Sequence, residues 1–166
     1  MRRLVIGGLG VVFTAAALAV PATASADANV PFTLASHAAP GLAVTPVDAG
    51  ESAPVLLIPR GSGPFQQWQP VYEGDGNYSL RNSSTGYCLS GEGLAGSQVY
   101  QTVCEGAPYE MWRVRVDREG NGVRFMAGTD LCLDARDGNV GPGAVLVQNT
   151  CSNAPSQIWD AVGYQE

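Results

Sequence analysis

Short apolar segments alternate with turn residues along most of the chain. Twenty-one glycines and eleven prolines are dispersed among segments rich in valine, leucine, tyrosine and phenylalanine. The clearest turn signals lie at residues 39–41, 73–77, 119–122 and 141–143. No stretch after residue 26 sustains the apolar spacing that an amphipathic helix requires. The pattern therefore predicts an all-β domain of many short strands joined by tight turns.

A similar phrase ending in tryptophan occurs three times. Trp68, Trp112 and Trp159 close the phrases FQQW, YEMW and SQIW, at separations of 44 and 47 residues. Repeats of this length are typical of folds in which one unit cannot bury its apolar face alone but several units together can. We therefore predict three units around a shared apolar axis. Their approximate bounds are residues 30–72, 76–117 and 121–164.

The cysteines follow the same register. Cys104 and Cys151 lie eight residues before the second and third tryptophans, and the corresponding position of the first unit holds Arg60.

A further position is aligned in the same way. Counting 27 residues back from the third and first tryptophans reaches Cys132 and Gly41, and the second unit reaches Cys88 after 24 residues. The segments that begin at these three residues are therefore expected to occupy one structural position.

The N-terminus reads as an export signal. Arg2 and Arg3 precede an apolar run over residues 4–20, and an A-x-A cleavage sequence follows at 24–26. The alternative is a membrane anchor, but the run is short for a span and the small residues follow it directly. We predict a signal peptide over residues 1–26 and a secreted domain over residues 27–166.

Four cysteines in an exported chain favour disulfides over free thiols. Three pairings are possible, and pairing within each unit is the simplest. It joins Cys88 to Cys104 and Cys132 to Cys151. A zinc site is not expected, because there is no C-x-x-C sequence and the single histidine, His37, is distant. We expect neither a metal nor another cofactor.

The charge balance argues against two classes of partner. The chain has a net charge of −6 and no lysine, and removal of residues 1–26 would leave seven arginines and a net charge of −8. Scattered arginines in an acidic chain form no basic surface for nucleic acid or anionic lipid. We expect a monomer that binds neither nucleic acid nor membranes.

Together these features resemble the ricin B-type lectin family, in a secreted bacterial single-domain member. The resemblance rests on three Q-x-W-like phrases, two C-L-x phrases and a second cysteine eight residues before two of the tryptophans. It covers essentially all of residues 27–166. It implies a β-trefoil of three pseudo-symmetric repeats, with one disulfide inside each of repeats two and three.

The resemblance separates structural residues from candidate sugar contacts. It implies that the Q-x-W positions are structural, and these are Gln66 and Trp68, Glu110 and Trp112, and Gln157 and Trp159. Glu110 departs from glutamine, and a carboxylate there needs hydrogen-bond donors of its own or access to solvent.

Sugar binding in this family uses a carboxylate directly after the C-L pair and a stacking aromatic ring two residues before the second cysteine. The carboxylate position holds Ala43, Ser90 and Asp134, and the aromatic position holds Ile58, Thr102 and Asn149. Only the third unit keeps the acid, and no unit keeps the ring. The candidate sugar contacts are Asp134 as hydroxyl acceptor, with Asn149 and Gln157 as orienting amides. Alternatively, Asp134 only orients Gln157 and the following turn.

Two function hypotheses follow. The first is a secreted carbohydrate-binding module for a polysaccharide or glycan, with at most one intact pocket, in the third unit. The alternative is a trefoil that has lost sugar binding and acts on a secreted protein, for instance as a protease inhibitor or interaction factor. In the second unit, Glu92 and Tyr100 offer an unrelated site. No enzyme is expected, because nothing brings His37 to a nucleophile.

Overall fold

The computed structural model describes residues 30–61, 63–117, 119–120 and 122–163, so the predicted signal peptide lies outside the described part. Over that part, no helix combines the length and apolar character needed to cross a bilayer. The secondary structure consists of short strands and three 3-10 turns, as the turn pattern predicts. The strands are β1 (Phe32–Ser36), β2 (Leu42–Pro46), β3 (Val55–Pro59), β4 (Gln67–Gly74), β5 (Asn77–Asn82), β6 (Cys88–Ser90), β7 (Tyr100–Thr102), β8 (Met111–Val116), β9 (Val123–Ala127), β10 (Leu131–Ala135), β11 (Leu146–Thr150) and β12 (Trp159–Val162). The 3-10 turns are η1 (Pro64–Gln66), η2 (Arg136–Gly138) and η3 (Pro155–Gln157).

Six of the strands close into an antiparallel barrel. β1 pairs with β4 and β12, β4 with β5, β5 with β8, β8 with β9, and β9 with β12, so the ladder returns to its starting strand. Closure gives each of these six strands a partner on both sides and removes the exposed edges of an open sheet.

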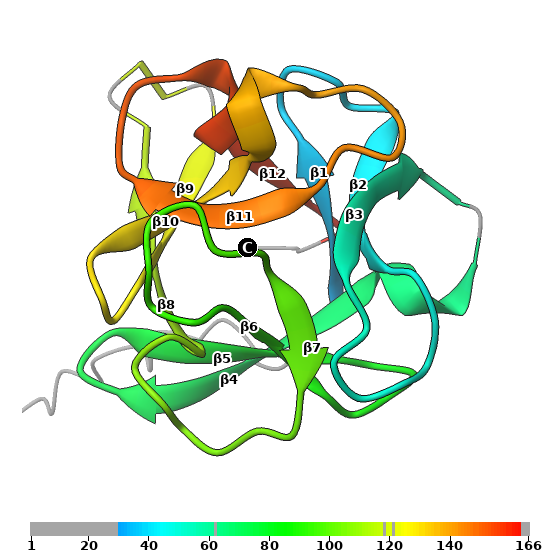
Figure 1. Ribbon diagram of the computed structural model, residues 1–166, viewed down its shortest axis with the longest axis vertical. Helices are drawn as coiled ribbons and strands as arrows, with labels where there is room; N and C mark the ends of the chain where they lie inside the picture. The colour runs from blue at the N-terminus through cyan, green and yellow to red at the C-terminus, as the bar shows by residue number, and fades with distance from the viewer. Residues whose placement is uncertain (1–29, 62, 118, 121, 164–166) are drawn as a thin grey trace, which may run out of the picture.

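The other six strands form three hairpins, β2–β3, β6–β7 and β10–β11, attached through β1, β5 and β9. In Figure 1, β3, β7 and β11 surround the middle of the view. Three isolated bridges connect the hairpins, Pro54 with Tyr100, Leu56 with Val145, and Gln98 with Val147. This all-β arrangement is trefoil-like, and it brings residues of separate hairpins together where one hairpin meets the next.

The three tryptophans form the centre of the core. Trp68, Trp112 and Trp159 are fully buried. Each indole Nε1 donates to a backbone carbonyl, and the acceptors are Val44 at 2.9 Å, Leu89 at 2.9 Å and Leu133 at 3.1 Å. A buried indole N–H requires an acceptor. The contact therefore fixes each tryptophan against the first strand of a hairpin.

The contact of Trp68 corrects one predicted alignment. Its acceptor, Val44, takes the place that Leu89 and Leu133 take for the other tryptophans. The strand register agrees, since the facing pairs are Ala43 with Ile58, Cys88 with Thr102, and Cys132 with Asn149. The segment that corresponds to Cys88 therefore begins at Ala43, and its alignment to Gly41 is wrong by two residues.

The predicted disulfide pairing is confirmed. Cys88 is bonded to Cys104 and Cys132 to Cys151, and no cysteine is free. Each bond fastens the first strand of a hairpin to the segment after its second strand. Ala43 and Arg60 stand at the corresponding positions around β2–β3, where this cross-link is therefore missing.

Candidate functional site

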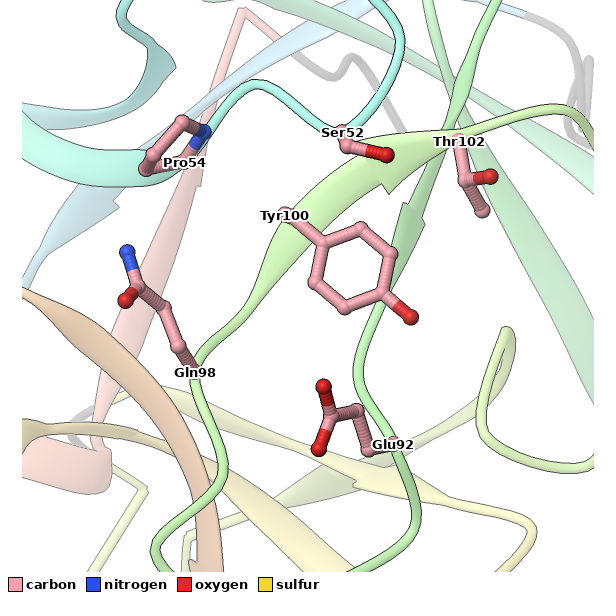
Figure 2. Close-up of a pocket in the computed structure, with 6 residues that line it drawn as sticks. All are labelled: Ser52, Pro54, Glu92, Gln98, Tyr100 and Thr102. Atoms are coloured by element: carbon pink, nitrogen blue, oxygen red, sulfur yellow. The ribbon is translucent and has the colours of Figure 1, made fainter.

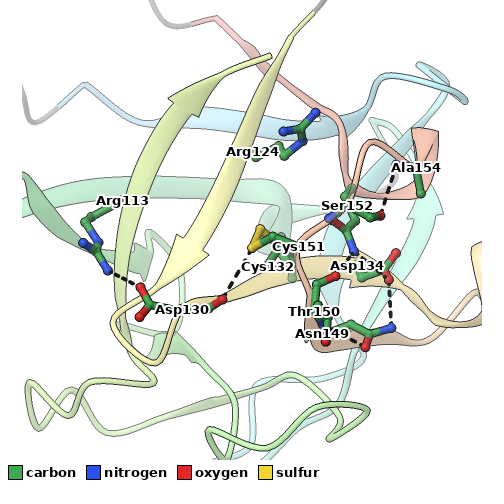
Figure 3. The surroundings of a disulfide bond; sticks show 12 residues. Arg113, Arg124, Asp130, Cys132, Asp134, Asn149, Thr150, Cys151, Ser152 and Ala154 are labelled. Carbon is green, nitrogen blue, oxygen red and sulfur yellow. Dashed lines mark hydrogen bonds and ion pairs between the residues drawn. A yellow bond between two sulfur atoms is a disulfide. The ribbon is translucent and has the colours of Figure 1, made fainter. Parts of the chain in front are cut away.

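The structure brings the three predicted sugar contacts together at one end of the β10–β11 hairpin. Asp134 lies on β10, Asn149 on β11 and Gln157 in η3. Asp134 Oδ2 accepts from Asn149 Nδ2 and from Gln157 Nε2, both at 3.1 Å. Figure 3 shows the first of these bonds beside the Cys132–Cys151 disulfide. The two amides therefore hold the carboxylate in one orientation.

Gln157 is itself held by the backbone. Its Oε1 accepts from the N–H of Ser152 at 2.7 Å, and its Nε2 also donates to the carbonyl of Thr150 at 2.9 Å. With the side chain 1% exposed, these bonds tie η3 to the end of β11. Gln157 is thus structural and, through Nε2, also a positioning residue for Asp134.

The second oxygen of Asp134 differs from the first. Asp134 is 5% exposed, and its Oδ1 is buried without a hydrogen-bond partner among the described residues. Leaving a buried carboxylate oxygen without a donor is costly. This oxygen can accept a hydrogen bond from a hydroxyl group that reaches it.

The β2–β3 hairpin carries the same arrangement with a hydroxyl in place of the carboxylate. Gln66 Nε2 donates to Thr45 Oγ1 at 3.2 Å and to the carbonyl of Pro59 at 2.9 Å, and its Oε1 accepts from the N–H of Gly61 at 2.7 Å. Thr45 therefore corresponds to Asp134, and the expectation that Ala43 does so is wrong. The cause is again the two-residue error in alignment.

After the β6–β7 hairpin, a carboxylate stands at the position that Gln66 and Gln157 hold after the other two hairpins. Glu110 is 1% exposed, and its Oε2 accepts the backbone N–H groups of Glu105 (2.9 Å), Gly106 (2.9 Å) and Ala107 (3.3 Å). The expectation that a glutamate here needs donors of its own is confirmed. Ser90, at the position of Asp134, is fully buried.

A cleft of about 440 Å³ lies where the second hairpin meets the loop before β3. Its lining residues are Ser52, Pro54, Glu92, Gln98, Tyr100 and Thr102, and we call it the Tyr100 cleft (Figure 2). The predicted proximity of Glu92 and Tyr100 is confirmed. Ser52 and Pro54 were not predicted, because the loop that carries them reaches β7 through contacts distant in sequence, such as the bridge between Pro54 and Tyr100 and the bonds of Gln101 to the backbone of Asp48 and Gly50.

The phenol of Tyr100 is held at one edge of this cleft. Its hydroxyl donates to the carbonyl of Gly91 at 3.2 Å. Burial raises the pKa of Tyr100 above its ordinary value of 10.0, the nearby carboxylates of Glu92 and Glu110 raise it further, and a hydrogen bond with Ser90 partly opposes them. The hydroxyl therefore lies in a partly desolvated position with a negative potential.

This pKa shift predicts a pH dependence of stability. A pKa that is raised on folding means that the folded protein favours the neutral phenol. The contribution of Tyr100 to the free energy of unfolding is therefore fully present below about pH 10, and it is lost as the pH rises through the folded-state pKa. We expect the difference in unfolding free energy between the wild type and Tyr100→Phe to change above about pH 10, at the expense of the wild type. Urea titrations of both proteins at neutral and alkaline pH measure this difference. The contributions of the other tyrosines cancel, because both proteins contain them. A difference that stays constant would contradict the shift.

His37 forms its ion pair with Asp160 and has no side-chain hydrogen bond or ion pair with Ser36 or Asp48 among the described residues. His37 Nδ1 lies 2.9 Å from Asp160 Oδ1, whereas Ser36 Oγ accepts the N–H of Ala39 and Asp48 accepts that of Gly50. No group of three or more His, Cys, Asp or Glu side chains suited to a metal ion occurs in the described part of the chain.

Comparison with known proteins agrees with this architecture. The ricin-type beta-trefoil lectin domain matches residues 32–159. A designed threefold-symmetric protein, ThreeFoil, has a TM-score of 0.73 at 27% identity, over 80% of this chain and 97% of its own. A Macrolepiota procera ricin B-like lectin solved with lactose has a TM-score of 0.71 at 20% identity, over 82% of this chain and 96% of its own.

The fold also occurs as one part of larger proteins. An exo-beta-1,3-galactanase from Clostridium thermocellum has a TM-score of 0.73 at 17% identity, and this chain spans 30% of it. The comparison with curated proteins gives no match. The domain match covers most of the residues that form the barrel and its three hairpins, and the chain therefore belongs to the ricin-type β-trefoil lectin family.

Proposed function

We propose that this protein is a secreted carbohydrate-binding module with a single sugar pocket of the family type, built around Asp134. Family membership supports carbohydrate binding, and the related Macrolepiota procera lectin was solved with lactose. Two disulfides support an oxidising, extracellular location. The observation that carries the proposal is the buried Asp134 Oδ1 without a donor, because a sugar hydroxyl would satisfy it.

The proposal includes three repeats over residues 30–72, 76–117 and 121–164. The recurring indole-to-carbonyl bonds and the matching hairpin registers support this division. Within it, the first and second repeats offer a hydroxyl, Thr45 or Ser90, where the third offers a carboxylate. A hydroxyl makes weaker hydrogen bonds to sugar than a carboxylate does. We therefore assign family-type sugar binding to the third repeat alone.

Recognition in this pocket depends on hydrogen bonds more than on stacking. Asp134 accepts from the sugar, while Asn149 and Gln157 hold its other oxygen. Asn149 stands where the family places an aromatic ring, so little apolar sugar surface is buried. We expect weak binding, because few contacts offset the cost of association.

Removing the carboxylate tests the proposal. We expect Asp134→Ala to lose retention on the polysaccharide or glycan that the wild type binds best on a glycan array. The variant should remain folded, because Gln157 Nε2 keeps its bond to the Thr150 carbonyl. Frontal affinity chromatography of both proteins measures the loss, and thermal unfolding checks the fold.

Thr45→Ala is the matched control. It deletes the corresponding hydrogen bond to Gln66 in the first repeat without touching the proposed pocket. It should therefore bind sugar as the wild type does. Equal retention of wild type and Asp134→Ala would show that Asp134 only orients Gln157, and the site assignment would then be abandoned.

A further inference from the structure

The Tyr100 cleft lacks the groups with which this family binds sugar. At the carboxylate position of the β6–β7 hairpin, Ser90 is fully buried, and its hydroxyl donates to the backbone carbonyl of the next residue at 3.2 Å. Thr102 stands at the position of the stacking ring. The carboxylates at the cleft come from other positions, Glu92 from the loop after β6 and Glu51 from the loop before β3. The ligand of the cleft must therefore be inferred from its own chemistry.

A buried glutamine holds the first wall of the cleft. Gln101 is fully buried, and its Nε2 donates to the carbonyls of Asp48 (3.1 Å) and Gly50 (2.8 Å). Its Oε1 accepts from Thr85 Oγ1 at 2.9 Å. The loop before Ser52 is therefore tied to β7 through a side chain that has no access to solvent.

A second buried glutamine, from the third hairpin, holds the opposite wall. Gln148 Oε1 accepts the N–H of Gly93 at 2.9 Å, and its Nε2 donates to the carbonyl of Tyr109 at 3.0 Å. Gln148 is fully buried, and a Cβ added at Gly91 would lie 2.2 Å from its side-chain carbonyl carbon, so this close approach requires glycine. The backbone on both sides of Glu92 is thus fixed, and the cleft is preformed as ligand sites usually are.

The cleft presents hydrogen-bond acceptors and negative charge. Four of its lining side chains carry an oxygen that can accept a hydrogen bond, and these are Glu92, Gln98, Ser52 and Thr102. The six lining residues include no arginine or histidine, and the chain has no lysine. In Figure 2 the four side chains lie on both sides of the Tyr100 ring, whose hydroxyl already donates to a backbone carbonyl. A ligand that fits is therefore a cation rich in donors, with a flat face for the ring.

An exposed leucine lies on the loop that borders the cleft. Leu94 is 65% exposed, and its loop connects two of the lining residues, Glu92 and Gln98. The carbonyl of Leu94 accepts the N–H of Ser97 at 3.1 Å and the hydroxyl of Ser97 at 2.6 Å, so a turn holds the loop in this conformation. An apolar side chain of a bound partner would shield Leu94 from water, which is favourable. A sugar, which carries hydroxyl groups at most positions, gains less from this leucine than a protein does.

We propose that the Tyr100 cleft is a docking site for another protein, which inserts an arginine side chain into it. A guanidinium group has five N–H donors and no acceptor, so it suits a site lined by oxygen acceptors. Its plane stacks on the ring of Tyr100, and Glu92 balances its charge. The remaining donors reach Gln98, Ser52 and Thr102. The ammonium group of a lysine is a compact charge that cannot stack flat on the ring and reach both sides of it.

The surroundings of the cleft add to the character of the partner. Leu94 contacts an apolar residue next to the inserted arginine. The net charge of the chain, −6, attracts a basic protein and repels an acidic one. This docking site does not depend on the sugar pocket proposed at Asp134.

Matched pentapeptides test this proposal. The probe is an acetylated and amidated peptide with arginine between two leucines and an alanine at each end. In the reference peptide, citrulline replaces arginine, which keeps the shape of the side chain and removes its charge. We expect NMR chemical-shift titrations at about 0.15 M salt to show the arginine peptide binding roughly tenfold more tightly, as one charge-assisted contact predicts. Glu92→Gln should remove this preference, whereas Glu105→Gln, which removes an exposed carboxylate outside the cleft, should keep it.

Further variants locate the bound arginine. Tyr100→Phe keeps the ring and should bind the peptide, whereas Tyr100→Ala, with its fold checked by circular dichroism, should not. Leu94→Ser should weaken binding of the peptide with leucines beside the arginine, but not of a peptide with glycines there. Asp134→Ala should bind the arginine peptide as the wild type does, which separates the docking site from the sugar pocket.

The proposal is overturned if the arginine and citrulline peptides bind equally or not at all, or if Glu92→Gln and Glu105→Gln weaken binding to the same extent. Equal affinity for a peptide with lysine in place of arginine would show attraction to charge alone and would overturn the assignment to arginine. A glycan-array signal that Glu92→Gln and Tyr100→Ala lose and Asp134→Ala keeps would place a sugar in the cleft and would overturn the docking of a protein. Loss of peptide binding in Tyr100→Phe would overturn the stacking geometry.

Discussion

A variant that lacks both disulfides is expected to be largely unfolded at about 37 °C. The bonds close loops with sequence separations of 16 and 19 residues. In the chain-entropy treatment each is worth about 3 kcal/mol, and the pair therefore about 6 kcal/mol. That loss is a large share of the roughly 5–15 kcal/mol by which domains of this size are stable. The loss of stability exceeds that of most single substitutions, because the variant lacks two cross-links that restrict the conformations of the unfolded chain.

The measurement is a thermal unfolding series followed by circular dichroism. Alanine replaces the buried Cys88 and Cys132, and serine replaces Cys104 and Cys151, so that no hydroxyl is buried. Each pair removed alone should lower the midpoint by roughly 10 °C, and both together should remove the cooperative transition at physiological temperature. The wild type in reducing agent should follow the double variant. A midpoint unchanged in either single-pair variant would show that the loops are held by other contacts.

The fold could be predicted from features that repeat at constant spacing. Ten residues separate Thr102 from Trp112 and Asn149 from Trp159, and the same number separates Ile58 from Trp68. This segment includes the second cysteine position and the Q-x-W phrase, and its length is constant because one end is paired within a hairpin and the other is a fully buried tryptophan. The disulfide pairing and the indole positions therefore followed from simple counting.

The one register error arose from the hairpin loops, whose length varies. Facing residues of the three hairpins are 15, 14 and 17 positions apart in sequence order. A surface loop accepts such differences at small entropic cost. In the second and third hairpins the cysteines mark the register. The first hairpin has no cysteine, and Gly41-Leu42 imitates the C-L phrase two residues too early.

The two candidate sites also differ in how far the sequence could predict them. Asp134 and Gln157 were predictable together, because both belong to phrases that recur in the sequence. The Tyr100 cleft was predictable only in part. Glu92 and Tyr100 are close in sequence, but Ser52 reaches them through the bridge between Pro54 and Tyr100 and the bonds of Gln101. Contacts between separate hairpins leave no periodic signal, so they emerge only from the three-dimensional structure.

The corrected register leads to the second large effect, a gain in stability from a third disulfide. Ala43 and Arg60 occupy the positions that Cys88 and Cys104 occupy around the next hairpin. The Cα atoms of Cys88 and Cys104 are 5.1 Å apart. We expect A43C/R60C to form a bond without backbone movement and to raise the unfolding free energy by about 3 kcal/mol. Urea unfolding of the oxidised and reduced forms of this one variant isolates the contribution of the bond.

The alternative alignment supplies the control. In G41C/R60C the two residues face each other in hydrogen-bonded register, because Arg60 N donates to Gly41 O at 2.8 Å. Side chains in such a pair are about 5.5 Å apart at Cβ, farther than the roughly 3.5–4.5 Å that a disulfide requires. The gain in unfolding free energy from a disulfide in G41C/R60C should therefore be smaller than that in A43C/R60C. If G41C/R60C is stabilised more than A43C/R60C, then the first hairpin follows the spacing of the third, and Thr45 loses its correspondence to Asp134.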